Sequence, residues 1–99
     1  MTKVAVLPGV YRETLSTGKG LMIVRFTFDA GAKVPLHRHP HEQSSYIVKG
    51  RLRYILEGRE VILSPGDSCI IPPNAPHEAE ALEETLDINS FTPVREDYL

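Results

Sequence analysis

Three of the four histidines in this 99-residue chain lie within five positions, in the segment His37-Arg38-His39-Pro40-His41-Glu42-Gln43. Side chains two positions apart in an extended segment point to the same face, so His37 and His39 present their imidazoles to one space. Imidazole nitrogens are common ligands of divalent transition metals. The spacing therefore predicts part of a metal site.

A metal site needs three or four donors that converge from different segments of the backbone. The fourth histidine, His77, lies far along the chain and follows the proline-rich residues 72–76. Proline restricts the backbone, so this connection would fix where the next strand begins. We therefore expect His77 to complete the site that His37 and His39 begin.

The fourth donor can be Gln43, which offers an amide oxygen, or Glu42 if a β-bulge shifts the chain by one residue. His41 is expected beside the site or on the surface, because alternation is unreliable in the turn after a proline. Three neutral imidazoles and one amide leave the charge of a divalent metal uncompensated, which favours an anionic ligand. The expected partner is therefore a small acidic molecule.

The elements that must position these donors are short extended runs between turn residues, without a sustained helical period. An all-β fold with about ten strands is typical of a sandwich or barrel. Residues 78–84 are good helix formers, but we expect a strand and a turn there because a lone helix of that length is marginal. The predicted strands are residues 4–7, 11–16, 21–28, 34–39, 44–49, 51–56, 59–63, 68–71, 77–81 and 85–92.

Glycine punctuates the predicted strands at positions where tight turns need a positive φ. Residues 51–56, which lie between two such turns, are expected to form the middle strand of a meander, packed between their neighbours in sequence. The five glycine turns are residues 17–20, 30–31, 49–50, 57–58 and 65–67.

Length and charge limit the possible functions. The chain suits one domain spanning residues 1–99. It carries 11 basic and 13 acidic residues, without a basic patch for nucleic acid. The first apolar run is too short for a membrane span or a secretory signal, so a cytoplasmic location is expected. The single cysteine, Cys69, excludes an intramolecular disulfide and is expected to be a small buried hydrophobic residue.

Two motifs that contain the histidines resemble those of the cupin family, over residues 31–81. The resemblance implies a double-stranded β-helix, or jelly-roll barrel, which usually forms homodimers. It also implies metal ligands at His37, His39 and His77 and at position 43, where cupins usually have Glu. The first motif is Gly31, five residues, His37-x-His39, Gln43, six residues and Gly50, and the second is Gly66, five residues, Pro72, four residues and His77.

The C-terminal part is similar to that of the KdgF-type cupins, which open the ring of 4,5-unsaturated uronic acids and use Gln as a metal ligand. An Asp-x-Phe-x-x-x-Arg stretch of that group is matched by Phe91 and Arg95, which the resemblance implies bind substrate. The open alternatives are core packing for Phe91 and a surface ion pair with a nearby acid for Arg95. Asn89 stands at the Asp position, and an amide cannot act as a general acid or base. Proton transfer would then fall to Asp87, which shares the parity of Asn89, or to a metal-bound water, with Arg95 assisting.

The expected function is metal-dependent conversion of an unsaturated uronic acid to its linear keto form. One divalent transition metal is expected, with nickel or zinc favoured over iron or manganese. Two alternatives stay open: a metal-dependent dioxygenase acting on a small acid or thiol, and a non-catalytic binding or sensing cupin, which Asn89 favours. We also expect a homodimer, because an edge strand such as residues 4–7 presents unpaired backbone groups.

Overall fold

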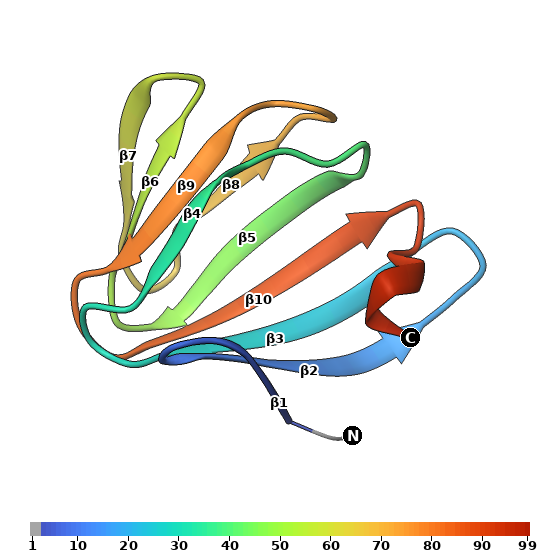
Figure 1. Ribbon diagram of the computed structural model, residues 1–99, viewed down its shortest axis with the longest axis horizontal. Coiled ribbons are helices and arrows are strands. Elements are labelled where there is room, and N and C mark those ends of the chain that lie inside the picture. The colour runs from blue at the N-terminus through green and yellow to red at the C-terminus, as the bar shows by residue number, and fades with distance from the viewer. Residues whose placement is uncertain (1–2) are drawn as a thin grey trace.

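The computed structural model describes residues 3–99, whose regular secondary structure is almost entirely β-strand (Figure 1). Ten strands are followed by one short 3₁₀-helix near the C-terminus. The elements are β1 Val4–Leu7, β2 Val10–Thr17, β3 Met22–Phe28, β4 Lys33–His37, β5 Glu42–Lys49, β6 Leu52–Leu56, β7 Arg59–Leu63, β8 Ser68–Ile71, β9 His77–Ala81, β10 Thr85–Thr92 and η1 Glu96–Tyr98.

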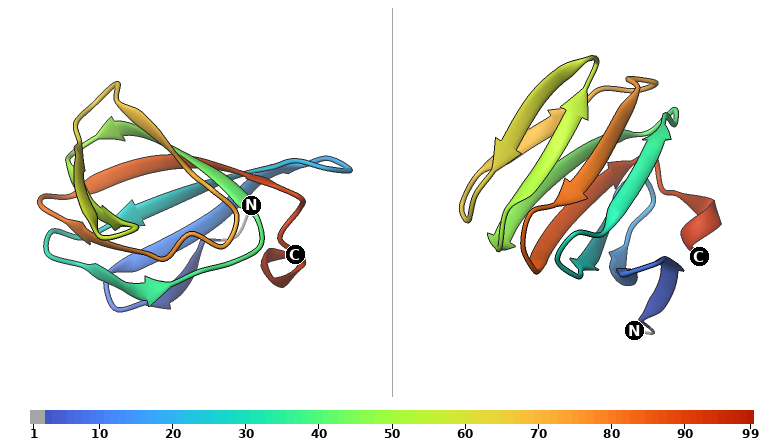
Figure 2. Two further views of the ribbon diagram at one scale, coloured as in Figure 1. Left: turned by 90° about the horizontal axis from the view of Figure 1, so that it is seen from above. Right: turned by 60° about the vertical axis from the view of Figure 1, so that its left-hand side comes forward.

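The strands form two antiparallel sheets. The six-stranded sheet has the order β1-β2-β3-β10-β5-β8, and the four-stranded sheet has the order β4-β9-β6-β7. The two sheets form facing layers that curve around a common interior (Figure 2). The predicted all-β jelly-roll barrel is confirmed.

The alternation of apolar and polar residues, together with the turn residues between the runs, predicted the strands closely. Each predicted strand occurs in the structure, with its ends shifted by at most two residues. Residues 78–84 continue β9 and then turn, as expected in spite of their helix propensity. β4 ends at His37 and β5 begins at Glu42, so His39 lies in the connection between these strands and not at the end of a strand. The helix η1 was not predicted.

The predicted meander is wrong. β6 pairs with β7 and β9, whereas β5 pairs with β10 and β8 in the other sheet. The chain therefore crosses between the sheets at Gly50, which has a φ of 86°. A Cβ atom at this position would clash with the carbonyl oxygen of Glu84 and with Thr85. The crossing depends on a residue without a side chain.

The turn at residues 17–20 also differs from the prediction, because neither of its glycines has a positive φ. The backbone amide of Gly18 donates to the carbonyl of Leu21 at 2.7 Å and closes this turn without a left-handed residue. The backbone conformation of this turn therefore does not require glycine.

Buried apolar side chains form two clusters between the sheets. The larger one fills the middle of the barrel and includes Ile47, Leu52 and Ile71, each fully buried. The smaller one joins Met22 and Val24 of β3 to Phe91 of β10. Cys69 packs against the larger cluster but is only half-buried, and its burial raises the pKa of its thiol to about 11. The thiol is therefore neutral at physiological pH.

Residues 3–99 contain no helix with the length and apolar character that crossing a bilayer requires. The cytoplasmic location, the lack of a nucleic-acid partner and the single domain over residues 1–99 stay predictions.

We expect Gly50→Ala to lower the free energy of unfolding by about 3 kcal/mol or more, because it combines left-handed strain with backbone overlap. Gly58→Ala is the matched control. Gly58 has a φ of 78° with no heavy atom near its added Cβ, so it should lose only about 1 kcal/mol. Denaturant unfolding measures both losses, and equal losses would show that the crossing at Gly50 is not tightly packed.

Candidate metal centre

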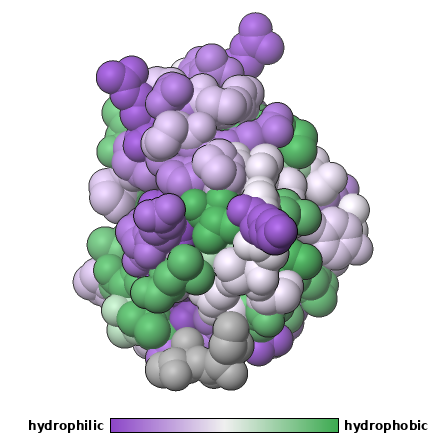
Figure 3. Space-filling model, turned by 90° about the vertical axis from the view of Figure 1, so that its right-hand side faces the viewer, coloured by the Kyte–Doolittle hydropathy of each residue, from purple (hydrophilic) through white to green (hydrophobic). Residues whose placement is uncertain are grey.

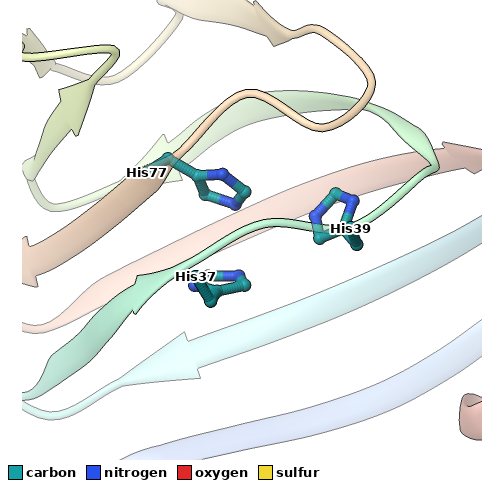
Figure 4. Close-up of side chains that lie close together, drawn as sticks. All are labelled: His37, His39 and His77. Carbon is teal, nitrogen blue, oxygen red and sulfur yellow. The ribbon is translucent and has the colours of Figure 1, made fainter.

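The three predicted histidines come together where the two histidine-containing motifs meet in space. His37 ends β4, His77 begins β9, and these strands pair so that the two residues lie opposite each other. A register irregularity lies between Val34 and His37 on β4, next to the site. His39 enters from the connection that follows β4, and all three imidazoles face one another (Figure 4).

The geometry of the three side chains suits a single metal ion. One ring nitrogen of each lies within 4.8 Å of those of the other two. The ring centroids of His37 and His77 are 4.2 Å apart, and those of His39 and His77 are 5.0 Å apart. His39 and His77 are buried and His37 is half-buried. The site is therefore partly screened from water but open on the side of His37.

Backbone carbonyls orient the three rings. In each ring Nδ1 lies within hydrogen-bond distance of a backbone carbonyl two residues away. A carbonyl oxygen only accepts, so in the neutral rings of His37 and His77 Nδ1 carries the hydrogen and Nε2 keeps a free lone pair for a metal. The pairs are His37 with Pro35 at 2.8 Å, His77 with Ala75 at 2.8 Å and His39 with His41 at 3.0 Å.

Burial keeps the rings in the form that binds metals. It lowers the pKa of His77 to about 4 and also lowers the pKa of His39. Both rings are therefore neutral at pH 7, and only a neutral imidazole can act as a ligand.

Gln43 faces the histidines and completes an arrangement that suits a cation. Its Oε1 lies 2.9 Å from Nε2 of His39, and its Nε2 donates to Oδ1 of Asn89 at 2.6 Å. Both nitrogens of His39 face oxygens that only accept, so a neutral ring leaves one of these two contacts without a hydrogen. With the hydrogen on Nδ1, as in the other two rings, the lone pair of His39 Nε2 faces Gln43 Oε1. Ligands at neighbouring corners of an octahedron with bonds of about 2.1 Å lie about 3 Å apart. These residues therefore fit a divalent metal, whose charge would attract both lone pairs.

The alternative donor, Glu42, lies on the other face of β5. Glu42 is exposed and Gln43 is buried, as regular alternation along β5 requires. His41 is half-buried, and its backbone carbonyl orients His39. The structure places His41 beside the site and not within the histidine group.

Asp87 is a buried carboxyl group in the wall of the same interior. Ser45 Oγ donates to its Oδ1 at 2.7 Å, and Tyr54 donates its hydroxyl hydrogen to Ser45 Oγ at 3.1 Å. Burial raises the pKa of Asp87 to about 6, against the opposing effect of the Ser45 hydrogen bond. A carboxyl group with this pKa can exchange a proton near neutral pH.

Asn89 lies two residues further along β10 on the same inward face. It is fully buried, and its Oδ1 accepts from Gln43. Its Nδ2 makes no well-formed hydrogen bond within residues 3–99, although the Asn89 side chain lies close enough to Asp87 to oppose the rise in the pKa of that carboxyl group. An unsatisfied buried donor is costly, so this N–H group is available to a bound ligand.

A cavity of about 210 Å³ joins these groups. Its apolar wall comes largely from the first three strands and its polar wall from the histidines and β10. The polar lining includes His37, Gln43, His77, Asp87, Asn89 and Arg95, and the apolar lining includes Leu7, Val10, Phe26 and Phe28.

Phe91 and Arg95 both line this cavity, and each also has a structural role. The ring of Phe91 belongs to the core and lies 5.9 Å from the ring of His39. Arg95 donates from Nε and Nη2 to the carboxylate of Asp97 at 3.3 and 2.8 Å. Core packing and an ion pair therefore coexist with a position at the cavity.

Four cavity or network residues were missed in the sequence: Arg12, Ser45, Tyr54 and Tyr98. Ser45 shares the inward parity of Gln43 on β5, so alternation could have found it. Tyr54 lies on β6 in the opposite sheet, and its approach to Ser45 depends on long-range packing. Arg12 and Tyr98 meet only because the C-terminal helix η1 folds back over β2.

Comparison with known proteins places the chain in a family. The cupin domain family matches residues 24–88. The pectin degradation protein KdgF of Dickeya dadantii (strain 3937) is 33% identical over 93 residues, which cover 92% of this chain and 84% of that protein.

Two solved structures are similar along almost the whole chain. The structure of KdgF from a Halomonas species has a TM-score of 0.95 and 39% identity, and the match covers 100% of this chain and 92% of that one. An RmlC-like cupin from Shewanella frigidimarina NCIMB 400 has a TM-score of 0.94 and 34% identity, covering 99% and 88%. With the domain match over most of its length and KdgF proteins among its relatives, this chain belongs to the cupin family.

Proposed function

We propose that this protein binds one divalent transition metal through His37, His39, Gln43 and His77 and opens the ring of a 4,5-unsaturated uronic acid. The observation that carries the proposal is the acceptor pair formed by His39 and Gln43 next to the imidazoles of His37 and His77. Imidazole and amide donors suit nickel or zinc, and iron or manganese is the alternative. A relative named for pectin degradation supports a sugar acid as the substrate.

A bound divalent metal supplies a Lewis acid whose charge the neutral donors leave uncompensated, and this favours an acidic substrate. Arg95 adds charge-assisted hydrogen bonds to the substrate carboxylate. Phe91 provides an apolar surface beside His39 against which a sugar ring can pack. These residues bind and orient the substrate in the cavity.

Ring opening is an isomerisation, so it needs proton movement and no oxidant. The anomeric hydroxyl loses its proton, the bond between C1 and the ring oxygen breaks, and C1 becomes a carbonyl carbon. The ring oxygen takes a proton and becomes the hydroxyl of an enol at C5. This enol gains a proton at C4 and loses its hydroxyl proton, which gives the keto form. Asp87, with a pKa of about 6, accepts and returns the proton in this proposal.

Asn89 has a separate role in the proposal. Its unpartnered Nδ2 donates a hydrogen bond to the substrate oxygen that gains negative charge when the ring opens. A second candidate function is binding without turnover, which the amide at position 89 favours because it cannot transfer a proton.

One experiment tests the metal and the reaction together. Purified protein should contain about one divalent metal per chain by elemental analysis. The metal-loaded protein should remove the absorbance of the conjugated double bond of an unsaturated uronate. His37→Ala should lose both metal and activity, because two imidazoles and an amide bind a divalent metal poorly.

The matched control for this experiment is His41→Ala. It removes a neighbouring imidazole but keeps the backbone carbonyl that orients His39, so metal content should be retained. Full metal content in His37→Ala would refute the site. Bound metal and bound uronate with unchanged absorbance would favour the binding module over the enzyme.

The buried carboxyl group predicts an unusual pH dependence of stability. The folded pKa of Asp87, about 6, lies above its ordinary value of 3.8. The protonated Asp87 side chain therefore makes its full contribution to the free energy of unfolding below about pH 4. This contribution is lost as the pH rises through about 6. Asp87→Asn keeps an acceptor for Ser45 but does not titrate. The variant should match the wild type near pH 4 and be more stable at pH 8, by up to about 3 kcal/mol.

Denaturant unfolding at a series of pH values measures this difference directly. A difference between Asp87→Asn and the wild type that stays constant from pH 4 to pH 8 would show that burial does not hold the carboxyl group neutral.

We also propose a homodimer formed through the free edge of β1. This strand ends the six-stranded sheet, and its Val4 and Val6 are exposed at 39% and 37%. An exposed apolar edge strand pairs readily with another strand. Light scattering at micromolar concentration should give the mass of a dimer. Replacing Val4 and Val6 together by Lys should give monomers, whereas Leu82→Lys, at an exposed site in a turn, should not.

A stable monomer of the wild-type protein at micromolar concentration would refute this assembly.

A further inference from the structure

We propose that Arg12 is a second carboxylate-binding residue of the cavity and selects sugar acids over neutral sugars. The motifs do not include Arg12, which lies on β2 and pairs with Val4 on β1 and Phe26 on β3. It is half-buried and lines the same cavity as His37 and Asn89. The inference deepens the proposed function and rests on it for the identity of the sugar acid.

Tyr98 holds Arg12 at this position. The guanidinium carbon of Arg12 lies 4.1 Å from the centroid of the Tyr98 ring, and that of Arg95 lies at the same distance from that ring. Cation–π contact of this kind fixes a guanidinium and is stronger where water is excluded. One aromatic ring therefore brings two arginines from distant parts of the chain to one end of the cavity.

The Tyr98 ring is itself well supported. It packs edge-on against Phe91, with centroids 5.7 Å apart, and against Phe26, with centroids 6.2 Å apart. The hydroxyl of Thr14 donates to the backbone carbonyl of Tyr98 at 3.4 Å. Figure 3 shows the face that carries η1, where strongly hydrophilic groups lie among apolar ones. The support fixes the positions of the guanidinium groups before a ligand binds.

The two arginines differ in their partners. Arg95 already donates two hydrogen bonds to Asp97, which neutralises much of its charge. In the ion pairs found within residues 3–99, Arg12 has no acidic partner. Burial raises the pKa of Tyr98, and a hydrogen bond from Arg12 to its hydroxyl opposes this rise. No carboxylate of the described residues occupies the planar set of donors of Arg12, which can therefore bind one through two parallel hydrogen bonds.

The charge balance at this end of the cavity also favours an anion. Two guanidinium groups meet one carboxylate, that of Asp97, which leaves a net positive charge beside a low-dielectric apolar wall. Such a wall strengthens the attraction between opposite charges. The small cavity volume, about 210 Å³, favours a single sugar acid over a longer chain.

The test measures binding of galacturonate, a saturated uronic acid, and of galactose, its neutral counterpart, by titration calorimetry of the full chain. Arg12→Met should weaken galacturonate binding about 10- to 100-fold, because it removes charge-assisted hydrogen bonds. Galactose binding should change far less. Arg59→Met is the matched control, since Arg59 is exposed on β7 and does not line the cavity.

A second variant separates recognition from support of the helix η1. Arg12→Gln removes the charge but keeps a planar group against Tyr98, so it should fold and still lose galacturonate affinity. If Arg12 only holds η1 in place, Arg12→Met should lower the melting temperature and leave galacturonate affinity unchanged. Equal affinity of the wild type and Arg12→Gln, including the case in which neither binds galacturonate, would overturn the inference.

The proposed ring opening fails by a different measurement. Unchanged absorbance of an unsaturated uronate with metal-loaded wild-type protein would reject that activity. It would leave the difference in galacturonate affinity between the wild type and the Arg12 variants as the result that decides the role of Arg12.

Discussion

The pairing of β4 with β9 is the constraint on which the rest of the site depends. It sets His37 opposite His77, although these residues lie far apart in the sequence. The carbonyls of Pro35 and Ala75 then fix both rings with Nε2 free. A shift of one residue in this register would turn one imidazole away from the other, because alternate side chains of a strand face opposite sides. The metal chemistry therefore depends on backbone pairing before it depends on the ligands.

Local alternation predicted those features that a single strand determines. It located ten strands and placed Asp87 and Asn89 on the same face of β10, both of which are buried. It could not predict that β6 pairs with β9, because strand pairing depends on which buried faces fit together in three dimensions. The contact between Arg12 and Tyr98 could not be predicted for the same reason, because it requires η1 to fold back over β2.

The inward face of β10 carries polar groups where a barrel would gain stability from apolar ones. Asp87 and Asn89 are almost fully buried, and an unpaired polar group in such a place costs free energy. Ser45 offsets part of this cost for Asp87 through a hydrogen bond, and burial raises the pKa of the carboxyl group so that it stays neutral more readily. The fold tolerates this cost along one side of the cavity, where both groups can contact a ligand.

The amide chain from His39 through Gln43 to Asn89 gives the site a direction. When Nε2 of the neutral His39 ring is an acceptor, the oxygen of Gln43 repels it. A cation between the two atoms would attract both and hold the Gln43 oxygen in this orientation. The amino group of Gln43 then donates to Asn89, and the amino group of Asn89 is left without a partner in the cavity wall. Metal binding at one end would therefore fix a hydrogen-bond donor at the other. A carboxylate at position 89 could accept from Gln43 in the same way but would present a second acceptor to the ligand. The asparagine thus reverses the hydrogen-bonding character of the cavity at this point, from acceptor to donor.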